Sequence, residues 1–327
     1  MDEKKLAALQ AYKNTAFALF ILATIPYGAQ YVLSFIFGLI EAHTGFDFAA
    51  TQWFSLFMGF APVYLVGMPL CMLLLREVPM DRVERTPLGI KGFLTCFLVC
   101  FPIMYIGNTF GNLFSTLFSG GAATNDVAEL AMETNLLRII PFVVLSPLLE
   151  ELIFRKQVLD RTVQYGERPA IVFSALVFAL IHGNLFQFFY AFGHGLLFGY
   201  IYVRTRRLRY TVILHMMVNF LGSVVTPYLL SQLPTEVMES LMAGELDMAA
   251  AADLPMTGLT MLLLFLVAEL TLGIVGLFVL VKKLPRVEFR TAELQMPREW
   301  VFPIVYCNAG SIQLILCTAL FMILSLL

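Results

Sequence analysis

The sequence has little charge. Only 13% of its 327 residues are Asp, Glu, Lys or Arg, whereas an ordinary soluble domain has about 25%. Because 59% of the residues are hydrophobic and the mean hydropathy is +0.82, the chain lacks the polar surface to face water on all sides. The formal net charge is −2, so no basic excess favours a nucleic-acid partner. The composition therefore predicts a protein whose solvent is the lipid bilayer.

Cysteine is also scarce, and its spacing argues against two kinds of structure. The five cysteines lie in or beside apolar runs, and no two of them form a Cys-x-x-Cys pair. Neither a zinc knuckle nor a disulfide scaffold is indicated, so we interpret the cysteines as small packing residues. They are Cys71, Cys96, Cys100, Cys307 and Cys317.

Long apolar runs are abundant instead. A membrane helix needs about 20 mainly apolar residues to cross about 30 Å of hydrocarbon. The runs are Thr15–Ile40, Trp53–Leu75, Phe93–Phe118, Leu137–Phe154, Pro169–Phe188, Phe189–Val203, Tyr210–Leu230, Leu259–Val281 and Val301–Leu327. They predict an all-α, polytopic helical bundle of about eight to nine transmembrane helices in a single membrane domain, residues 1–327. The fifth and sixth runs are short, and Gly183-Asn184 is the expected turn between them.

Lysine and arginine alternate along the connections between these runs. Basic residues occupy the N-terminus and the connections after the second, fourth, sixth and eighth runs, and the intervening connections have none. Because positive residues stay on the cytoplasmic side, this pattern predicts a multi-pass protein of the cell membrane with a cytoplasmic N-terminus. The C-terminus is then expected outside.

Ionisable side chains within membrane spans are costly, so each one needs a reason. The predicted spans hold Glu150, Glu151, His182, His194, His215 and Glu269. Glu151 and Arg155 have i,i+4 spacing with the acid first, which favours an ion pair. Glu150 is rotated from Glu151 by about 100° on a helix, and a partly buried carboxyl without a partner suits a general base or acid. The alternative is a pair of helix-end carboxylates held by cytoplasmic arginines.

Two further pairs repeat the i,i+4 spacing. Phe178 can pack on His182 and orient its imidazole, although such a histidine can also be a packing residue. His215 and Asn219 share a helical face and can both donate hydrogen bonds to a developing oxyanion. The alternative is an interhelical hydrogen-bond pair. Together, one carboxylate pair and two histidines within about 70 residues favour a function over packing.

Other polar positions carry less information. His194 adjoins a Gly-x-x-x-Gly pattern typical of close helix packing, and we interpret it as structural. Glu269 lies in the eighth run without a partner nearby in sequence, so we expect it to be protonated or paired with a distant donor. Ser146 and Ser174 have no catalytic context in the sequence.

The three motifs, Glu-Glu-x-x-x-Arg, Phe-x-x-x-His and His-x-x-x-Asn, occur in this order on successive predicted helices. The arrangement resembles the CAAX protease and bacteriocin-processing family, also called the Abi family of membrane proteases. The resemblance covers about residues 137–225, which we take as an Abi/CAAX-protease-like catalytic core. It implies a cavity open to the cytoplasm, in which Glu150 and His182 activate a water. His215 and Asn219 would form the oxyanion hole, and Glu151 and Arg155 would hold the geometry.

The sequence thus predicts an intramembrane endopeptidase without a cofactor, surrounded by membrane lipid and acting on a peptide or a lipidated protein. In a zinc-dependent version, Glu150, His182 and His215 are three ligands and water is the fourth. No His-Glu-x-x-His pair is present, so the metal-free glutamic version is favoured. A non-catalytic scaffold or bacteriocin-immunity protein of the same family is the alternative, and a transporter is a third hypothesis.

Overall fold

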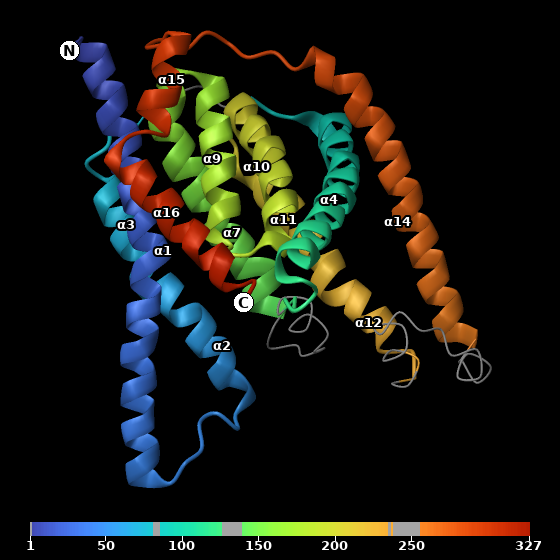
Figure 1. Cartoon of the computed structure of the whole chain (residues 1–327). Coiled ribbons are helices and arrows are strands. Elements are labelled where there is room, and N and C mark those ends of the chain that lie inside the picture. Colours follow the sequence, from blue (N-terminus) through green and yellow to red (C-terminus); the bar gives the residue numbers. More distant parts are fainter. Residues whose placement is uncertain (1, 81–85, 126–138, 235–236, 238–255) are drawn as a thin grey trace.

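The computed structural model describes residues 2–80, 86–125, 139–234, 237 and 256–327, and these residues form helices and no strand (Figure 1). This confirms the all-α prediction. The helices are α1 (Glu3–Thr44), α2 (Gln52–Ala61), η1 (Pro62–Gly67), α3 (Met68–Leu75), α4 (Gly89–Ser119), η2 (Ile140–Leu145), α7 (Ser146–Glu151), η3 (Leu152–Leu159), α8 (Asp160–Thr162), η4 (Val163–Tyr165), α9 (Glu167–Ile181), α10 (Leu185–Thr205), α11 (Leu208–Phe220), η5 (Leu221–Val225), α12 (Thr226–Leu230), α14 (Met256–Lys283), η7 (Leu284–Arg286), α15 (Arg298–Val305) and α16 (Ala309–Leu324). The segments η1, η2, η3 and η5 are π-helical, whereas η4 and η7 are 3₁₀-helical.

Several helices are long and apolar enough to cross a membrane. In the described part of the chain there are five: Glu3–Thr44, Trp53–Leu75, Gly89–Ser119, Leu208–Leu230 and Met256–Arg286. A sixth results if α15 and α16, bent by 59° at their junction, count as one span. The protein is therefore a multi-span membrane protein. The predicted spans four to six are helical apart from the turn at residues 182–184, except that residues 137 and 138 of the fourth lie outside the described residues. These spans are not among the five, so the count of eight to nine is not confirmed.

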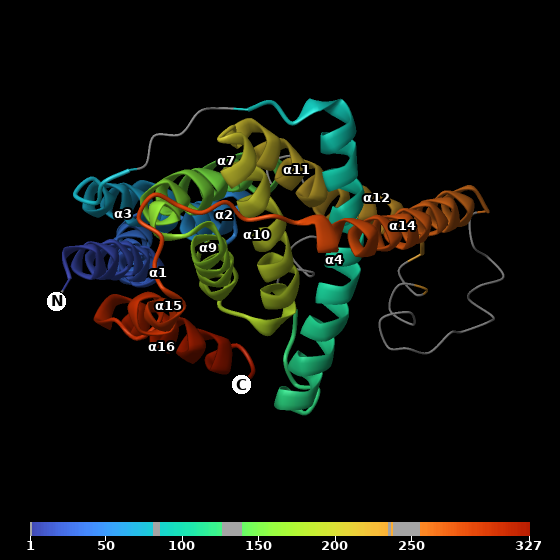
Figure 2. The same cartoon turned by 90° about the horizontal axis from the view of Figure 1, so that it is seen from above.

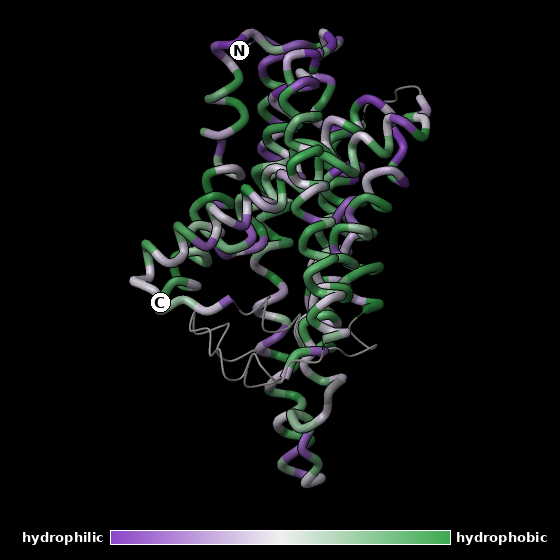
Figure 3. Tube along the Cα trace, turned by 90° about the vertical axis from the view of Figure 1, so that its right-hand side faces the viewer, coloured by the Kyte–Doolittle hydropathy of each residue, from purple (hydrophilic) through white to green (hydrophobic). Residues whose placement is uncertain are grey.

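The surface agrees with a lipid environment. Large apolar side chains are exposed along the outer helices. Examples are Tyr31, with 78% of its area exposed, and Phe278, with 69%. A soluble monomer rarely exposes apolar patches of this extent. Hydrophobic residues run along most of the helices in Figure 3, and hydrophilic ones gather at the end that holds the N-terminus.

The helices α9 and α10 form the hairpin at the centre of the bundle, between α1 and α16 on one side and α4 on the other (Figure 2). The predicted turn is confirmed: Gly183 has φ +67°, and Asn184 caps α10 by accepting a hydrogen bond from Gln187 N. The second helix begins at Leu185, earlier than the predicted Phe189. The cap explains the shift, because it satisfies a backbone N–H of the first turn.

Glycines let the central helices approach each other. Gly195 of α10 faces the backbone of Ala175 on α9, and Gly107 of α4 faces the backbone of Tyr190 on α10. His194 lies buried beside them, with its Nε2 3.2 Å from the carbonyl oxygen of Cys100 on α4. These contacts agree with the interpretation of this segment as structural. The close approach of α4, α9 and α10 creates the frame on which the polar residues of the centre are held.

Candidate active site

The paired glutamates lie on a helical segment that changes its winding twice. The one-and-a-half turns of α7 carry them, with the wider π-helical turns of η2 before and η3 after. Such π-helical turns are frequent at functional sites. In η2 the N–H of Ser146 donates a hydrogen bond to the carbonyl of Pro141. In the same register, the amide of the next residue would donate to the carbonyl of Phe142. That amide belongs to Pro147, which has no N–H, and the Phe142 carbonyl instead accepts from Asn219 Nδ2 at 2.9 Å.

The predicted Glu151–Arg155 ion pair is present and fully enclosed. Arg155 Nε lies 3.0 Å from Glu151 Oε2 and Arg155 Nη2 lies 3.2 Å from Oε1, and both side chains are 0% exposed. The guanidinium also donates to Ser174 Oγ on α9 and lies 4.7 Å from the centre of the Phe178 ring. The bidentate pair lies within one continuous helix, and the bond to Ser174 links that helix to α9. Ser174, which has no signal in the sequence, is part of this network.

His215 links α11 to the same carboxylate. Its Nδ1 lies 3.2 Å from Glu151 Oε1. Because an ionised carboxylate only accepts hydrogen bonds, Nδ1 carries the proton and the ring orientation is fixed. The other nitrogen, Nε2, then faces Glu150 Oε2 at 3.9 Å. That separation is too long for a direct hydrogen bond.

His182 stands at the C-terminal end of α9 with its ring held on both sides. Its Nδ1 lies 2.8 Å from the carbonyl oxygen of Phe178, which can only accept, so Nδ1–H donates. The Phe178 ring meets the imidazole edge to face, with 4.9 Å between the ring centres. The predicted packing of this pair is thus confirmed. In the neutral tautomer the lone pair of Nε2 is left free to accept a proton.

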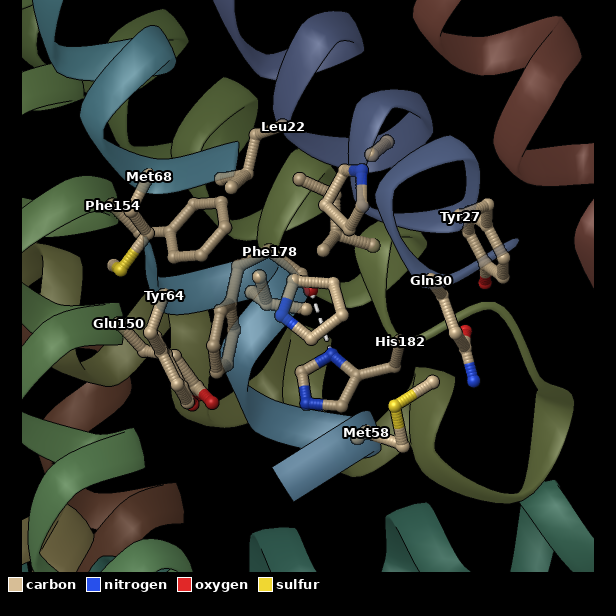
Figure 4. Close-up of a pocket in the computed structure, with 16 residues that line it drawn as sticks. Leu22, Tyr27, Gln30, Met58, Tyr64, Met68, Glu150, Phe154, Phe178 and His182 are labelled. Atoms are coloured by element: carbon tan, nitrogen blue, oxygen red, sulfur yellow. Dashed lines mark hydrogen bonds between the residues drawn. The ribbon is translucent and has the colours of Figure 1, made fainter. Parts of the chain in front are cut away.

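Glu150 and His182 line one pocket of about 360 Å³ (Figure 4). Its other walls are mostly apolar and come from α1, α2, η1, α3, η3 and α9, with Leu22, Met58 and Phe154 among them. His215 and Asn219 do not line it. His215 reaches the site behind Glu150 and Glu151, and Asn219 contacts the backbone of η2.

Two polar residues of the site were not predicted. Ser146 donates a hydrogen bond to Glu150 Oε1, and Tyr64 of η1 lies beside Glu150 in the wall of the pocket (Figure 4). The i,i+4 spacing of Ser146 and Glu150 is a signal that could have been noticed. Nothing in the sequence links Tyr64 to them, because the contact exists only once η1 packs beside α7. The sequence offers no catalytic context for Ser146, and the structure places its hydroxyl against Glu150.

The zinc hypothesis requires several ligands close together. Within the residues that the structure describes, no group of three or more His, Cys, Asp or Glu side chains is placed to hold a metal ion. Glu150, His182 and His215 are therefore not gathered as a three-ligand set, which catalytic zinc needs.

Glu269 lies apart from these residues. Its carboxyl is paired with a donor that is distant in sequence, as we expected, because Tyr105 Oη donates a hydrogen bond to Glu269 Oε2 at 3.1 Å.

These features define a class: an all-helical, multi-span membrane protein with a carboxylate and an imidazole facing one pocket between its helices. Residues 132–221 match the model of a family described as type II CAAX prenyl endopeptidase Rce1-like. The matched segment contains all six predicted site residues, and the match supports the resemblance to the CAAX protease and bacteriocin-processing family that the motifs carry. No curated protein and no solved structure matches the chain.

Proposed function

We propose that the protein is an intramembrane endopeptidase of the CAAX-protease type, which hydrolyses a peptide bond of a membrane-associated peptide or lipidated protein. The observation that carries the proposal is the shared pocket of Glu150 and His182, two side chains from separate helices. The family match supports the reaction class. The mostly apolar walls of the pocket suit a hydrophobic or lipid-bearing substrate.

A water held between Glu150 and His182 is the proposed nucleophile. The carboxylate and the free Nε2 lone pair of His182 each accept one of its hydrogens, which leaves an oxygen lone pair for attack on the peptide carbonyl. One acceptor takes the proton as the carbon–oxygen bond forms. The same group then protonates the leaving amine, so the carbon–nitrogen bond breaks and both residues return to their initial state.

His215 and Asn219 are the proposed oxyanion hole. The Asn219 amide has two N–H donors and Phe142 uses one of them. His215 already donates from Nδ1 to Glu151, so donation to an oxyanion from Nε2 requires the doubly protonated imidazolium. Glu151 would balance that charge, while Arg155 holds Glu151 in place. This assigns the second glutamate and the arginine to positioning rather than to bond making.

We propose the glutamic rather than the zinc-dependent version, because the three candidate ligands are not gathered around a common point. Purified protein should therefore keep its peptidase activity after dialysis against a strong chelator, with less than one zinc per ten active molecules by elemental analysis. Activity that is lost with the chelator and regained with zinc, but not with magnesium, would establish the metal-dependent version.

The membrane arrangement completes the proposal. The helices that bear the site, from η2 to η3 and α9 to α10, would lie among the five apolar spans and bring the bundle to eight or nine crossings. The N-terminus would be cytoplasmic, the membrane would be the cell membrane, and the cavity would open to the cytoplasm. Residues 137–225 would be the catalytic core of a single membrane domain, 1–327. The alternation of basic and non-basic connections supports this arrangement.

The substitution Glu150→Gln tests the reaction. It keeps the size of the side chain and removes its basicity, so cleavage of membrane-anchored test peptides by the purified protein should fall at least about a thousandfold. Glu269→Gln is the matched control, because it changes a carboxyl within the bundle that is remote from the pocket. Peptides with and without a lipid chain on a cysteine near the cleaved bond would define the substrate.

The same pair of variants separates the alternatives. Thermal unfolding of both should resemble that of the parent protein, so that a loss of activity reports on chemistry. A Glu150→Gln protein that cleaves as fast as the parent would remove the mechanism. A biological effect of the protein that persists in that variant would indicate the non-catalytic scaffold or immunity role.

A further inference from the structure

A second pocket lies away from the active site, where α10 ends and α11 begins. Its volume is about 470 Å³, and it is lined by Lys156, Tyr202, Arg206, Arg207, Leu208 and Arg209. Four of these six residues are positively charged. The basic connection between α10 and α11 is one of those that the distribution of Lys and Arg places on the cytoplasmic side.

Among the described residues, Asp160 is the carboxylate that pairs with the basic side chains of this pocket. Asp160 accepts hydrogen bonds from Arg206 Nη1 at 2.8 Å and from Tyr202 Oη at 3.0 Å, and Lys156 Nζ lies 3.8 Å from it. Neither Arg207 nor Arg209 forms an ion pair with a carboxylate among the described residues. The Nε of Arg207 is buried and has no hydrogen-bond partner there. A buried donor of this kind is costly unless a ligand accepts from it.

The backbone is shaped to gather these side chains. Arg206 has φ +50°, the only positive value for a non-glycine residue in the described part of the chain. Non-glycine residues rarely adopt this left-handed conformation. Here it ends α10 and turns the chain directly into α11, so Arg206, Arg207 and Arg209 face one pocket within a single turn. The first backbone N–H groups of α11, which lack helical partners, add to the positive potential.

We propose that this pocket binds a phosphate group, and that its occupant is the headgroup of an anionic phospholipid of the cytoplasmic leaflet. Clustered arginines supply the forked donors that suit phosphate. Basic pockets between helices on the cytoplasmic side are suited to anionic headgroups. Leu208 and the adjoining spans offer an apolar border for the acyl chains. A soluble phosphate compound shares the chemistry and is the source that the experiment must distinguish.

The position of the pocket gives the bound phosphate a structural effect. Lys156 follows Arg155 on η3, whereas Arg207 and Arg209 open the helix that carries His215. A phosphate that contacts these residues links η3 to the start of α11. The same two segments also contact Glu151, through Arg155 of η3 and His215 of α11. Binding to the folded state alone raises thermal stability, so the lipid should stabilise the protein as well as occupy the site.

The test uses the full-length protein in a neutral detergent, with native mass spectrometry and thermal unfolding as readouts. The probes are dioleoylphosphatidylglycerol, dioleoylphosphatidylcholine and sodium phosphate. The variant R207Q/R209Q should bind the phosphatidylglycerol at least about tenfold more weakly than the parent and lose most of its stabilisation by that lipid. The control K282Q/K283Q removes two exposed lysines at the end of α14, outside the pocket, and should bind as the parent does.

The outcomes separate the sources of the phosphate. Binding of phosphatidylglycerol that is unchanged in R207Q/R209Q, or weakened equally in K282Q/K283Q, overturns the proposal. Stabilisation by millimolar sodium phosphate that phosphatidylglycerol does not reproduce overturns the lipid as the occupant. If the double variant is poorly folded, R209Q alone, which changes an exposed side chain, should still weaken the binding about threefold. None of these readouts requires peptidase activity.

Discussion

Among single residues, the centre of the site is organised by a carboxylate that cannot reach the pocket. Glu151 is fully buried, and it receives hydrogen bonds from Arg155 on its own helix and from His215 on α11. A buried ion pair contributes little net stability, because desolvation offsets much of the attraction. Its value here is geometric. The pair sets the orientation of the His215 ring and leaves the neighbouring Glu150 free to face the pocket.

Ser146 is the residue whose role the structure adds. Its hydroxyl holds Oε1 of Glu150, which leaves Oε2 towards His215 and the pocket. In Ser146→Ala the carboxylate loses a charge-assisted hydrogen bond worth about 1.5–3 kcal/mol, and it can rotate away from the reacting water. We expect kcat to fall about tenfold or more, with KM nearly unchanged because Ser146 does not line the pocket.

Steady-state kinetics on one lipidated peptide would measure this split. Ser146→Thr keeps the hydroxyl and should recover most of the activity, whereas Ser231→Ala, an exposed serine near the end of α12, should have no effect. A rise in KM with constant kcat would show instead that Ser146 acts on substrate binding. Unchanged kinetics would mean that Glu150 needs no such support.

For the helices as units, the closeness of α4 and α10 is the feature that holds the site together. A Cβ on Gly107 would overlap the backbone of Tyr190, so Gly107→Ala must push the two helices apart. Overpacking of this kind costs about 1–3 kcal/mol. We expect a lower midpoint of thermal unfolding. We also expect a partial loss of activity, because α10 is one of the closely packed central helices that lie beside His215.

Gly28→Ala provides the comparison, since a Cβ at Gly28 would meet no atom within 4 Å. Alanine favours a helix over glycine by about 1 kcal/mol, so this variant should unfold at the same temperature or slightly higher. Circular dichroism during heating in one detergent would measure both. Equal midpoints for the two variants would contradict the close contact between α4 and α10.

Contacts within one helical turn were predictable from the sequence, whereas contacts between distant segments were not. The pairs Glu151–Arg155 and Phe178–His182 were predictable because each lies within one helical turn, where spacing alone decides proximity. The turn at Gly183 was predictable from its residue type. The bond from Asn219 to Phe142 was not, because it depends on a π-helical register and on a proline without an N–H. The place of Tyr64 beside Glu150 in the pocket likewise required tertiary packing.

The whole molecule combines this polar centre with an unusually long first helix. The 42 residues of α1 extend about 63 Å at 1.5 Å per residue, roughly twice the thickness of the hydrocarbon layer. Its C-terminal end projects beyond the other helices in Figure 1. Tyr31 and Phe35 on this part are largely exposed and apolar. The helix must therefore tilt strongly, or carry an apolar end beyond the bundle on the side opposite the N-terminus.

The orientation of the molecule in the membrane follows from the same helix. Lys4, Lys5 and Lys13 lie at its start, and residues 41–52 have no lysine or arginine, so the start is expected in the cytoplasm. In a background with Cys307→Ser, which removes the exposed native cysteine, a thiol reagent that cannot cross membranes should label Thr44→Cys in intact cells. Glu3→Cys should be labelled only after the membrane is opened. Labelling of Glu3→Cys in intact cells would reverse the orientation and place the basic pocket on the outer side.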